Sequence, residues 1–249
     1  MAARLFVEID AADPDRASLD AAGARHLRAL RLGPGDAIEA IVGPGLLRRG
    51  VIERCTRSGA IVRLLEPLPG PTADPPRRTV LALALGDLAR MDLVVEKATE
   101  LGATDLWPVV AGRSQVRRLP EARLARWERI ARAACEQCGR TRPPLIEEPA
   151  PLGLLAERVP AGSLLVLLRP EPATPPPPPT GNRPLVLVVG PEGGLSAEEN
   201  AALIASGAAP LSFGPRVLRF ETAAIAALAW AAVGGPPRAP DGCGPAGRE

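Results

Sequence analysis

The spacing of apolar residues along the chain changes near residue 70. Before that point, short apolar or alternating stretches are separated by turns rich in glycine, such as Gly33-Pro34-Gly35-Asp36. Stretches of this length between glycine turns are typical of β-strands, and several of them in succession suggest a small barrel. We therefore predict strands over residues 4–9, 37–42, 50–54 and 60–65, with a helix over 24–32.

A proline-rich break at residues 70–76 is followed by buried runs that alternate with amphipathic stretches. Continuous apolar runs are typical of strands buried on both faces, and Leu93, Val94, Ala98 and Leu101 recur at helical spacing. This alternation predicts an α/β domain with a largely parallel sheet. The predicted strands are 79–85, 105–110, 163–168, 185–189 and 209–212, and the predicted helices are 90–101, 121–138, 196–206 and 221–233.

These patterns divide the chain into a first domain at 1–70 and a second at 77–235, with a disordered tail at 236–249. Hydrophobic residues make up 46% of the chain and charged residues 23%, which is typical of a soluble globular protein. No apolar run is long enough to cross a bilayer, and no secretory signal is visible. We expect a cytoplasmic protein without a membrane partner.

Cysteine and lysine usage excludes several kinds of site. Cys135 and Cys138 form a single Cys-x-x-Cys pair, and His26 is the one histidine of the chain. A tetrahedral zinc site would lack ligands, and the pair falls late in a predicted helix rather than at a helix start, so we predict no metal and no redox centre. Lys97 lies in Val-Glu-Lys-Ala-Thr, which excludes a phosphate-binding P-loop.

Charge is concentrated in one segment. Between Arg113 and Arg142 there are nine arginines and three glutamates, although the net charge of the chain is only +2. Arginine clusters bind phosphates through their planar, two-pronged guanidinium groups. A solvated helix face is the equally weighted alternative on charge alone.

Two glycine-containing loops follow predicted strands. Gly190-Pro-Glu-Gly-Gly precedes a Ser196-x-x-Glu199 capping box, and Gly214-Pro-Arg-Val-Leu-Arg precedes an alanine-rich helix. In an open α/β sheet, ligands bind in the crevice beyond the carboxyl ends of the strands, where glycine lets the backbone approach them. The two loops together predict a ligand pocket. Neither has the spacing of a dinucleotide fingerprint.

The same loops carry a family resemblance. Gly190-Pro-Glu-Gly-Gly-Leu-Ser and Gly214-Pro-Arg-Val-Leu-Arg, the latter followed by Glu221-Thr-Ala, closely resemble the RsmE family of ribosomal RNA methyltransferases. Three further stretches match in order: His26-Leu-Arg-Ala-Leu-Arg-Leu-Gly-Pro-Gly-Asp, Glu96-Lys-Ala-Thr-Glu-Leu-Gly and Ala134-Cys-Glu-Gln-Cys-Gly-Arg. Together the five motifs cover the chain from about residue 4 to residue 233.

The resemblance implies the fold and the activity. It implies a SPOUT-type α/β domain with a trefoil knot, preceded by a PUA-like β-barrel that binds RNA. It also implies methylation of N3 of a specific uridine in small-subunit (16S) ribosomal RNA, with S-adenosyl-L-methionine as cofactor. The expected partners are ribosomal RNA or the small ribosomal subunit and a second copy of the chain, in the context of ribosome biogenesis.

Site residues follow from the matched motifs. The expected cofactor-binding residues are Leu168, Gly190, Glu192, Gly193, Gly194, Leu211, Gly214, Val217, Leu218 and Phe220. The expected RNA-binding residues are Arg25, Arg28, Arg31, Arg113, Arg117, Arg118, Arg123 and Arg126. Family members usually carry threonine in place of Phe220, so ring packing replaces a hydroxyl contact in this chain.

Methylation at N3 also needs groups that remove a proton or stabilise the resulting anion. The candidate bases are Glu136 and Glu221, and the candidate stabilisers are Arg140 and Arg219. For each of these, a helix-end charge or a salt bridge is the alternative. Two rival functions are an inactive RNA-binding assembly factor, against which the two intact glycine loops argue, and a methyltransferase of the same fold that acts on transfer RNA.

Overall fold

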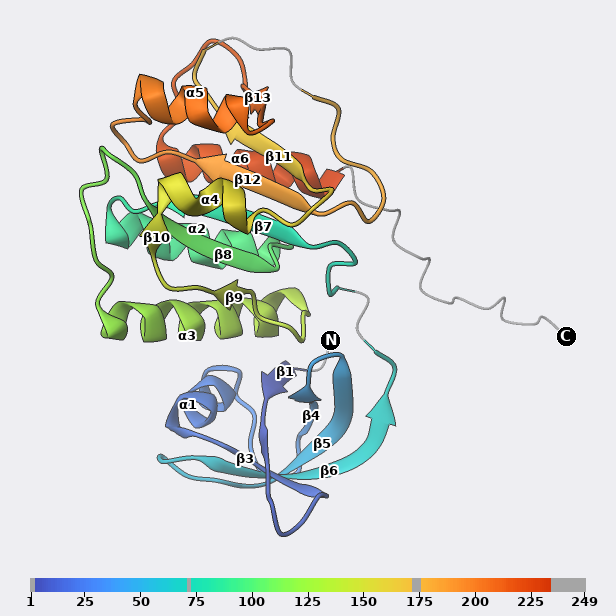
Figure 1. Ribbon diagram of the computed structural model, residues 1–249. Coiled ribbons are helices and arrows are strands. Elements are labelled where there is room, and N and C mark those ends of the chain that lie inside the picture. Colours follow the sequence, from blue (N-terminus) through green and yellow to red (C-terminus); the bar gives the residue numbers. More distant parts are fainter. Residues whose placement is uncertain (1–2, 71–72, 172–175, 234–249) are drawn as a thin grey trace, which may run out of the picture.

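Two β-sheets, one at each end of the molecule, are separated by a long helix (Figure 1). The computed structural model describes residues 3–70, 73–171 and 176–233. The tail predicted at 236–249 lies outside the described residues. Both sheets carry helices, and the fold is α/β.

The first sheet is built from six strands in the order β1-β4-β5-β6-β3-β2. Its strands are β1 (Ala3–Phe6), β2 (Glu8–Ile9), β3 (Arg16–Leu19), β4 (Ala37–Gly43), β5 (Leu46–Cys55) and β6 (Ala60–Leu68). The two outermost strands of this order, β1 and β2, are separated in the chain by Val7 alone, so the sheet curls until its first and last strands adjoin. Helix α1 (Ala21–Ala29) buries Leu27 against the sheet.

The sequence predicted the helix and most of the strands of this part, but it missed β3, made β5 and β6 too short and misplaced the limits of the helix. Helix α1 begins before residue 24 because the side chain of Asp20 caps it by accepting from the backbone N–H of Gly23 at 2.8 Å. It ends before residue 32 because Arg31 adopts the left-handed conformation, with φ of 59°. The predicted strand 4–9 is split at Val7 where the chain changes partner strand.

The second sheet is parallel throughout its described pairings. Its strand order is β10-β8-β7-β12-β11-β13, with β9 also paired to β8. The strands are β7 (Thr79–Ala84), β8 (Asp105–Val110), β9 (Leu145–Ile146), β10 (Ala150–Pro151), β11 (Leu164–Leu168), β12 (Leu185–Val189) and β13 (Ala209–Leu211). Strands β7 and β12 are buried along their whole length, as their continuous apolar runs predicted.

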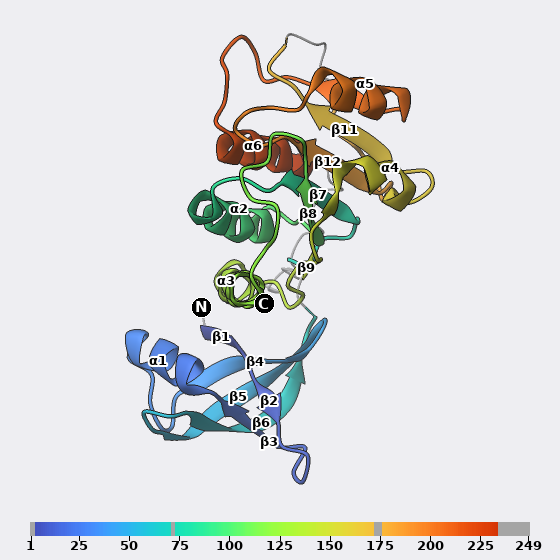
Figure 2. The same ribbon diagram turned by 60° about the vertical axis from the view of Figure 1, so that its left-hand side comes forward.

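Helices cover both faces of this sheet (Figure 2). One face packs against α2 (Leu88–Glu100), α3 (Glu121–Cys138) and α6 (Phe220–Val233). The other face packs against α5 (Ala197–Ala205) and α4 (Leu155–Arg158). A 3-10 turn, η1 (Leu152–Leu154), directly precedes α4. The predicted limits of α3 are confirmed residue for residue, whereas α4, β9 and β10 were not predicted.

The C-terminal half of α3 joins the two sheets. The carboxylate of Glu136 accepts a hydrogen bond from the backbone N–H of Phe6 at 3.0 Å, and its other oxygen lies 3.2 Å from Nδ1 of His26. The guanidinium of Arg132 stacks over the Phe6 ring, 4.8 Å from its centroid. Just beyond the helix, the hydroxyl of Thr141 accepts from the backbone N–H of Gly45 at 2.8 Å. These contacts hold the first sheet against the second.

Candidate functional site

A cavity of about 570 Å³ lies at the carboxyl ends of three neighbouring strands, β12, β11 and β13. Its walls are the segments that follow these strands, together with side chains from α2, α5 and the loop after β8. The lining residues are 168–171, 189–195, 211–213 and 216–220, with Arg90, Arg113, Asn200 and Ala223. This is the edge of an open parallel sheet at which ligands bind.

Nine of the ten residues predicted to bind the cofactor line this one cavity. Gly214 is the exception: it adopts φ of 95°, which shapes the loop without lining the cavity. Leu211 and Phe220 are buried, whereas Val217 is 83% exposed. The two glycine loops therefore line one and the same cavity.

Hydrogen bonds fix the first glycine loop. Glu192 accepts from the backbone N–H of Asp87 at 2.8 Å, which ties the loop to the start of α2. A Cβ at Gly86 would lie 2.5 Å from Oε2 of Glu192, so a side chain there would displace the Glu192 carboxylate. The guanidinium of Arg113 donates to the carbonyl oxygen of Gly193 at 2.9 Å, and Gly194 adopts φ of 68°. The loop is held in shape from both sides by the protein itself.

Cations outnumber anions around the cavity. Five arginines and two glutamates line it: Arg90, Arg113, Arg169, Arg216, Arg219, Glu171 and Glu192. Arg169 pairs with Glu171 at 3.0 Å. Arg216 and Arg219 are exposed, and neither forms an ion pair within the described part of the chain. The mouth of the cavity is thus positively charged and suits an anionic partner.

Comparison with known proteins assigns the family. A family described as "RNA methyltransferase domain" matches residues 73–232. A Mycobacterium tuberculosis protein named ribosomal RNA small subunit methyltransferase E is 36% identical over 208 residues, which cover 80% of this chain and 78% of that protein. The chain belongs to this methyltransferase family, RsmE. A Synechocystis relative of the same name is 32% identical over 236 residues, covering 92% of this chain and 77% of its own length.

Solved structures agree with this membership of the RsmE family. The enzyme of that name from Neisseria gonorrhoeae, bound to S-adenosyl methionine, superposes with a TM-score of 0.80 at 28% identity and covers 92% of this chain and 96% of its own. A putative methyltransferase from Legionella pneumophila, also in complex with S-adenosyl methionine, gives a TM-score of 0.82 at 31% identity, over 94% and 98% of the two chains.

Two of the four predicted catalytic side chains of this RsmE-family protein lie beside the cavity. Arg219 lines it, and Glu221 follows Phe220 at the start of α6. The side chain of Glu221 is only 11% exposed, and its Oε1 lies 3.6 Å from Nη1 of Arg90. Its Oε2 is buried without a hydrogen-bond partner.

The structure places Glu136 outside the cavity. Both of its carboxylate oxygens face the first sheet, where they contact Phe6 and His26 as described above. Burial raises the pKa of this carboxyl, against the opposing effects of these two contacts. Glu136 does not line the cavity and joins the two sheets.

Arg140 likewise lies outside the cavity. Its guanidinium is buried and donates to the backbone oxygens of Thr99 at 2.6 Å and of Ala103 at 2.9 Å. Gly139 ends α3 in the left-handed conformation, and Arg140, which follows it, bonds carbonyl oxygens at and just beyond the end of α2. Burial lowers the pKa of Arg140 and raises that of the Cys135 thiol to about 12, which keeps the thiol protonated.

No cluster of three or more metal-ligating side chains occurs within residues 3–70, 73–171 and 176–233. In the same residues, no helix is long and apolar enough to span a bilayer.

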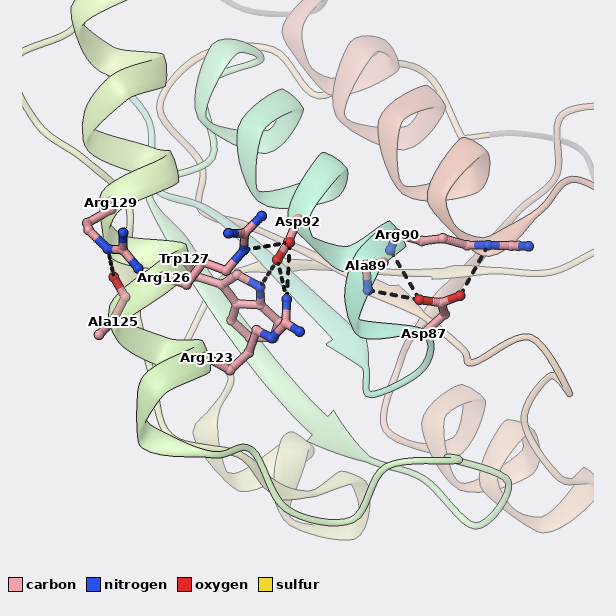
Figure 3. A network of polar contacts seen from close by, with 9 residues as sticks. All are labelled: Asp87, Ala89, Arg90, Asp92, Arg123, Ala125, Arg126, Trp127 and Arg129. Atoms are coloured by element: carbon pink, nitrogen blue, oxygen red, sulfur yellow. Dashed lines mark hydrogen bonds and ion pairs between the residues drawn. The ribbon is translucent and has the colours of Figure 1, made fainter. Parts of the chain in front are cut away.

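The predicted RNA-binding arginines fall into two groups. Arg25, Arg31 and Arg118 are exposed and make no side-chain ion pair within the described residues. The others contact the protein: Arg28 donates to Thr56, Arg117 to Gly112 and Arg113 to Gly193, while Arg123 and Arg126 bond Asp92. Figure 3 shows these last two converging on Asp92 with Trp127, whose indole N–H donates at 2.9 Å.

Among the cavity residues that sequence reasoning missed are two polar side chains from helices, Arg90 of α2 and Asn200 of α5. A signal for Arg90 was present. Asp87 caps α2 directly after β7, and β7 is the neighbour of β12 in the sheet. A polar helix start after β7 therefore lies beside the first glycine loop.

Proposed function

We propose that this chain methylates N3 of a uridine in 16S ribosomal RNA, with S-adenosyl-L-methionine as the methyl donor. The observation that carries the proposal is the convergence of both glycine loops on one cavity at the carboxyl ends of parallel strands. Membership of the RsmE family and the S-adenosyl methionine bound to two structural relatives support it.

The cavity fits this cofactor in size and chemistry. Its volume of about 570 Å³ falls within the range of roughly 300–1,000 Å³ that small-molecule sites occupy. Leu168, Leu211, Leu218 and Phe220 offer apolar surface for the adenine and the thioether, and the glycine loops offer backbone groups. Bound there, the cofactor would supply a methyl group attached to a sulfonium sulfur. Uridine N3 loses its proton, and the electron pair of N3 forms the bond to the methyl carbon. The electrons of the broken carbon–sulfur bond stay on sulfur.

The residues of the chain contribute chiefly orientation and electrostatics. A preformed first loop, fixed through Glu192 and Arg113, holds the donor without reorganisation during the reaction. For the negative charge that develops on the uracil we retain Arg219, which lines the cavity beside Phe220; Glu221, an anion, contributes through its ion pair with Arg90. Arg216 and the exposed arginines Arg25, Arg31 and Arg118 supply phosphate contacts.

The finer architecture is part of the same proposal. We assign residues 1–70 to a PUA-like barrel and residues 77–235 to a SPOUT domain with a trefoil knot. The curled six-stranded sheet supports the first assignment, and the parallel sheet with its two loops at one edge supports the second. The enzyme acts in the cytoplasm, where ribosomal RNA is available, on free RNA or on the small subunit.

We also propose that the enzyme is a homodimer. Seven of the 14 residues of helix α6 are alanine, and Ile225, Ala226 and Ala229 on it are only half-buried within one chain. Small side chains let two such helices approach closely. Association would cover this apolar surface.

Nucleoside analysis tests the activity. Ribosomal RNA from cells with and without the gene should be digested and examined by mass spectrometry, and N3-methyluridine should be present only with the gene. If small-subunit RNA is unchanged, the proposal fails. A new methylated nucleoside in transfer RNA would instead favour a transfer RNA methyltransferase, and no S-adenosylhomocysteine binding would favour an inactive assembly factor.

A further inference from the structure

Arg90 stands between two carboxylates at the wall of the cavity. Its Nε lies 3.6 Å from Oδ2 of Asp87, and its Nη1 lies 3.6 Å from Oε1 of Glu221. Both distances are too long for hydrogen bonds, and its guanidinium makes none within the described part of the chain. Figure 3 shows Arg90 and Asp87 side by side at the start of α2. The group is oriented by charge, while its five N–H donors stay free.

Both carboxylates are themselves held in place. Asp87 caps α2 by accepting from the backbone N–H of Ala89 at 2.8 Å, and its own backbone N–H binds Glu192 of the glycine loop. Glu221 is almost buried in the first turn of α6. Arg90 is therefore fixed to the two elements that form the cavity wall. Its side chain is still 40% exposed, so a ligand in the cavity can reach it.

The other four arginines of the cavity differ from Arg90. Arg113 donates to Gly193, and Arg169 donates to Glu171. Arg216 and Arg219 are exposed, with no carboxylate to orient them within the described residues. Of the five, Arg90 alone combines a fixed orientation with an unused set of donors.

The free donors indicate the kind of group that Arg90 binds. Asp87 and Glu221 pair with its guanidinium at distances that leave the N–H groups unused, so these groups can donate to the carbonyl oxygens of a planar ring. Fixed donors also stabilise negative charge that forms on such a ring during the reaction.

We propose that Arg90 is a catalytic residue that donates a hydrogen bond to a carbonyl oxygen beside N3 of the target uracil. This inference rests on the proposed function. When N3 releases its proton to water, its negative charge is shared with the two flanking carbonyl oxygens, O2 and O4, and Arg90 stabilises that charge. Asp87 and Glu221 are positioning residues that act through Arg90. Cytosine carries an amino group in place of O4, so the same donors disfavour it.

The test uses the full-length enzyme and small-subunit particles reconstituted with RNA that contains either uridine or 5-fluorouridine. Fluorine makes N3 more acidic, so less help is needed to remove its proton. Arg90→Gln should lower the single-turnover rate at saturating RNA by about 10²-fold on uridine, the usual effect of losing one donor of this kind, and by clearly less on 5-fluorouridine. Arg90→Lys should lie between Arg90→Gln and the wild type.

Arg129→Gln on α3 is the matched control, since Arg129 is exposed and lies outside the cavity. It should leave both rates unchanged. Calorimetry with S-adenosylhomocysteine should give the same affinity for wild type, Arg90→Gln and Arg90→Lys, and this also shows that the variants are folded. An equal loss on both RNAs, or no loss, overturns the role of Arg90. A wild-type enzyme that makes no N3-methyluridine overturns the proposed function instead.

Discussion

The backbone N–H of Phe6 in the first sheet donates a hydrogen bond of 3.0 Å to the carboxylate of Glu136 near the end of α3. Glu136 belongs to a motif that the sequence placed beside the target base. In the structure it lies at the junction of the two sheets, where His26 provides its second contact. The motif therefore determines how the two halves of the molecule meet.

Replacement of Glu136 tests this structural role. Glu136→Ala should lower stability by about 1–3 kcal/mol, because the N–H of Phe6 loses its acceptor, and should change turnover at saturating RNA by less than about threefold. Burial raises the pKa of Glu136, so the folded state holds its proton more tightly than the unfolded state does. The ionised carboxylate thus costs stability at neutral pH, and this cost vanishes below about pH 4, near the ordinary value.

Glu136→Gln mimics the protonated form. Urea denaturation should show that Glu136→Gln is at least as stable as the wild type at neutral pH. Near pH 4, which is roughly the ordinary pKa of a carboxyl group, the two proteins should be equally stable. If this variant loses turnover by about tenfold or more, Glu136 takes part in catalysis.

Gly194 and Gly181 allow a matched test of the cavity. Both adopt φ of 68°, and a Cβ at either would meet no atom within 4 Å, but only Gly194 lines the cavity. Arginine at either place should cost about 1–2 kcal/mol for its left-handed backbone. Calorimetry with S-adenosylhomocysteine should find no binding to Gly194→Arg and normal binding to Gly181→Arg. Normal binding to both would remove this loop from the cofactor site.

Asp92 should stabilise the packing of α2 against α3. Burial opposes its ionisation, but hydrogen bonds from Arg126, Trp127 and Arg123 outweigh that effect, and the pKa of its carboxyl is lowered. Asp92→Asn should therefore lower the unfolding free energy by about 1–3 kcal/mol at neutral pH.

The contribution of Asp92 should disappear in acid. Since its pKa is lower in the folded state, the stabilisation is complete above the ordinary carboxyl value of about 3.9 and is lost as the pH falls below it. Urea denaturation from neutral pH downward measures this, with Glu128→Gln, an exposed carboxylate of the same region, as control. A stability difference independent of pH would exclude the ionised network as its source.

Arg118 should be a phosphate contact. It is exposed and makes no ion pair within the described residues, whereas the equally exposed Arg183 donates to the backbone oxygens of Gly162 and Ser163. Arg118→Ala should weaken RNA binding and reduce the slope of log affinity against log salt by about one, with little effect on turnover at saturation. Arg183→Ala should leave the slope unchanged. Equal slopes for wild type and Arg118→Ala would place Arg118 off the RNA path.

Oligomeric state can be tested with two isoleucines. Light scattering of the wild type should give twice the chain mass of 25.9 kDa. Ile225→Arg on α6 should give monomers, because a charge would replace apolar surface in the proposed interface, while Ile204→Arg, 39% exposed on α5, should remain dimeric. An active wild-type monomer would exclude the dimer.

The local sequence pattern was enough to predict a long amphipathic helix and strands that are buried along most of their length. The limits of α3, β8 and β12 were predicted correctly because helical periodicity and continuous apolar runs leave a clear trace. Strands β9 and β10 have two residues each and exist through their pairing with β8, a contact between distant parts of the sequence. No local pattern reports such a pairing.

The site shows the same limit at the level of side chains. The glycine loops could be placed because parallel strands end at a common edge. The direction of Arg140 could not, because it depends on the left-handed turn at Gly139 and on the carbonyl groups that α2 brings within reach. Arg90 was overlooked for a related reason, since its two carboxylates come from helices far apart in the chain.

Helix α3 sets a length. Its 18 residues span about 27 Å, because each residue of an α-helix adds about 1.5 Å. The helix starts soon after the segment that contacts the cavity through Arg113, and it ends near the residues that contact the first sheet. The position of the first sheet relative to the cavity is thus set by one rigid helix. One residue inserted into α3 would rotate the side chains that contact the first sheet by about 100° around the helix axis, so an intact cavity would face a displaced first sheet.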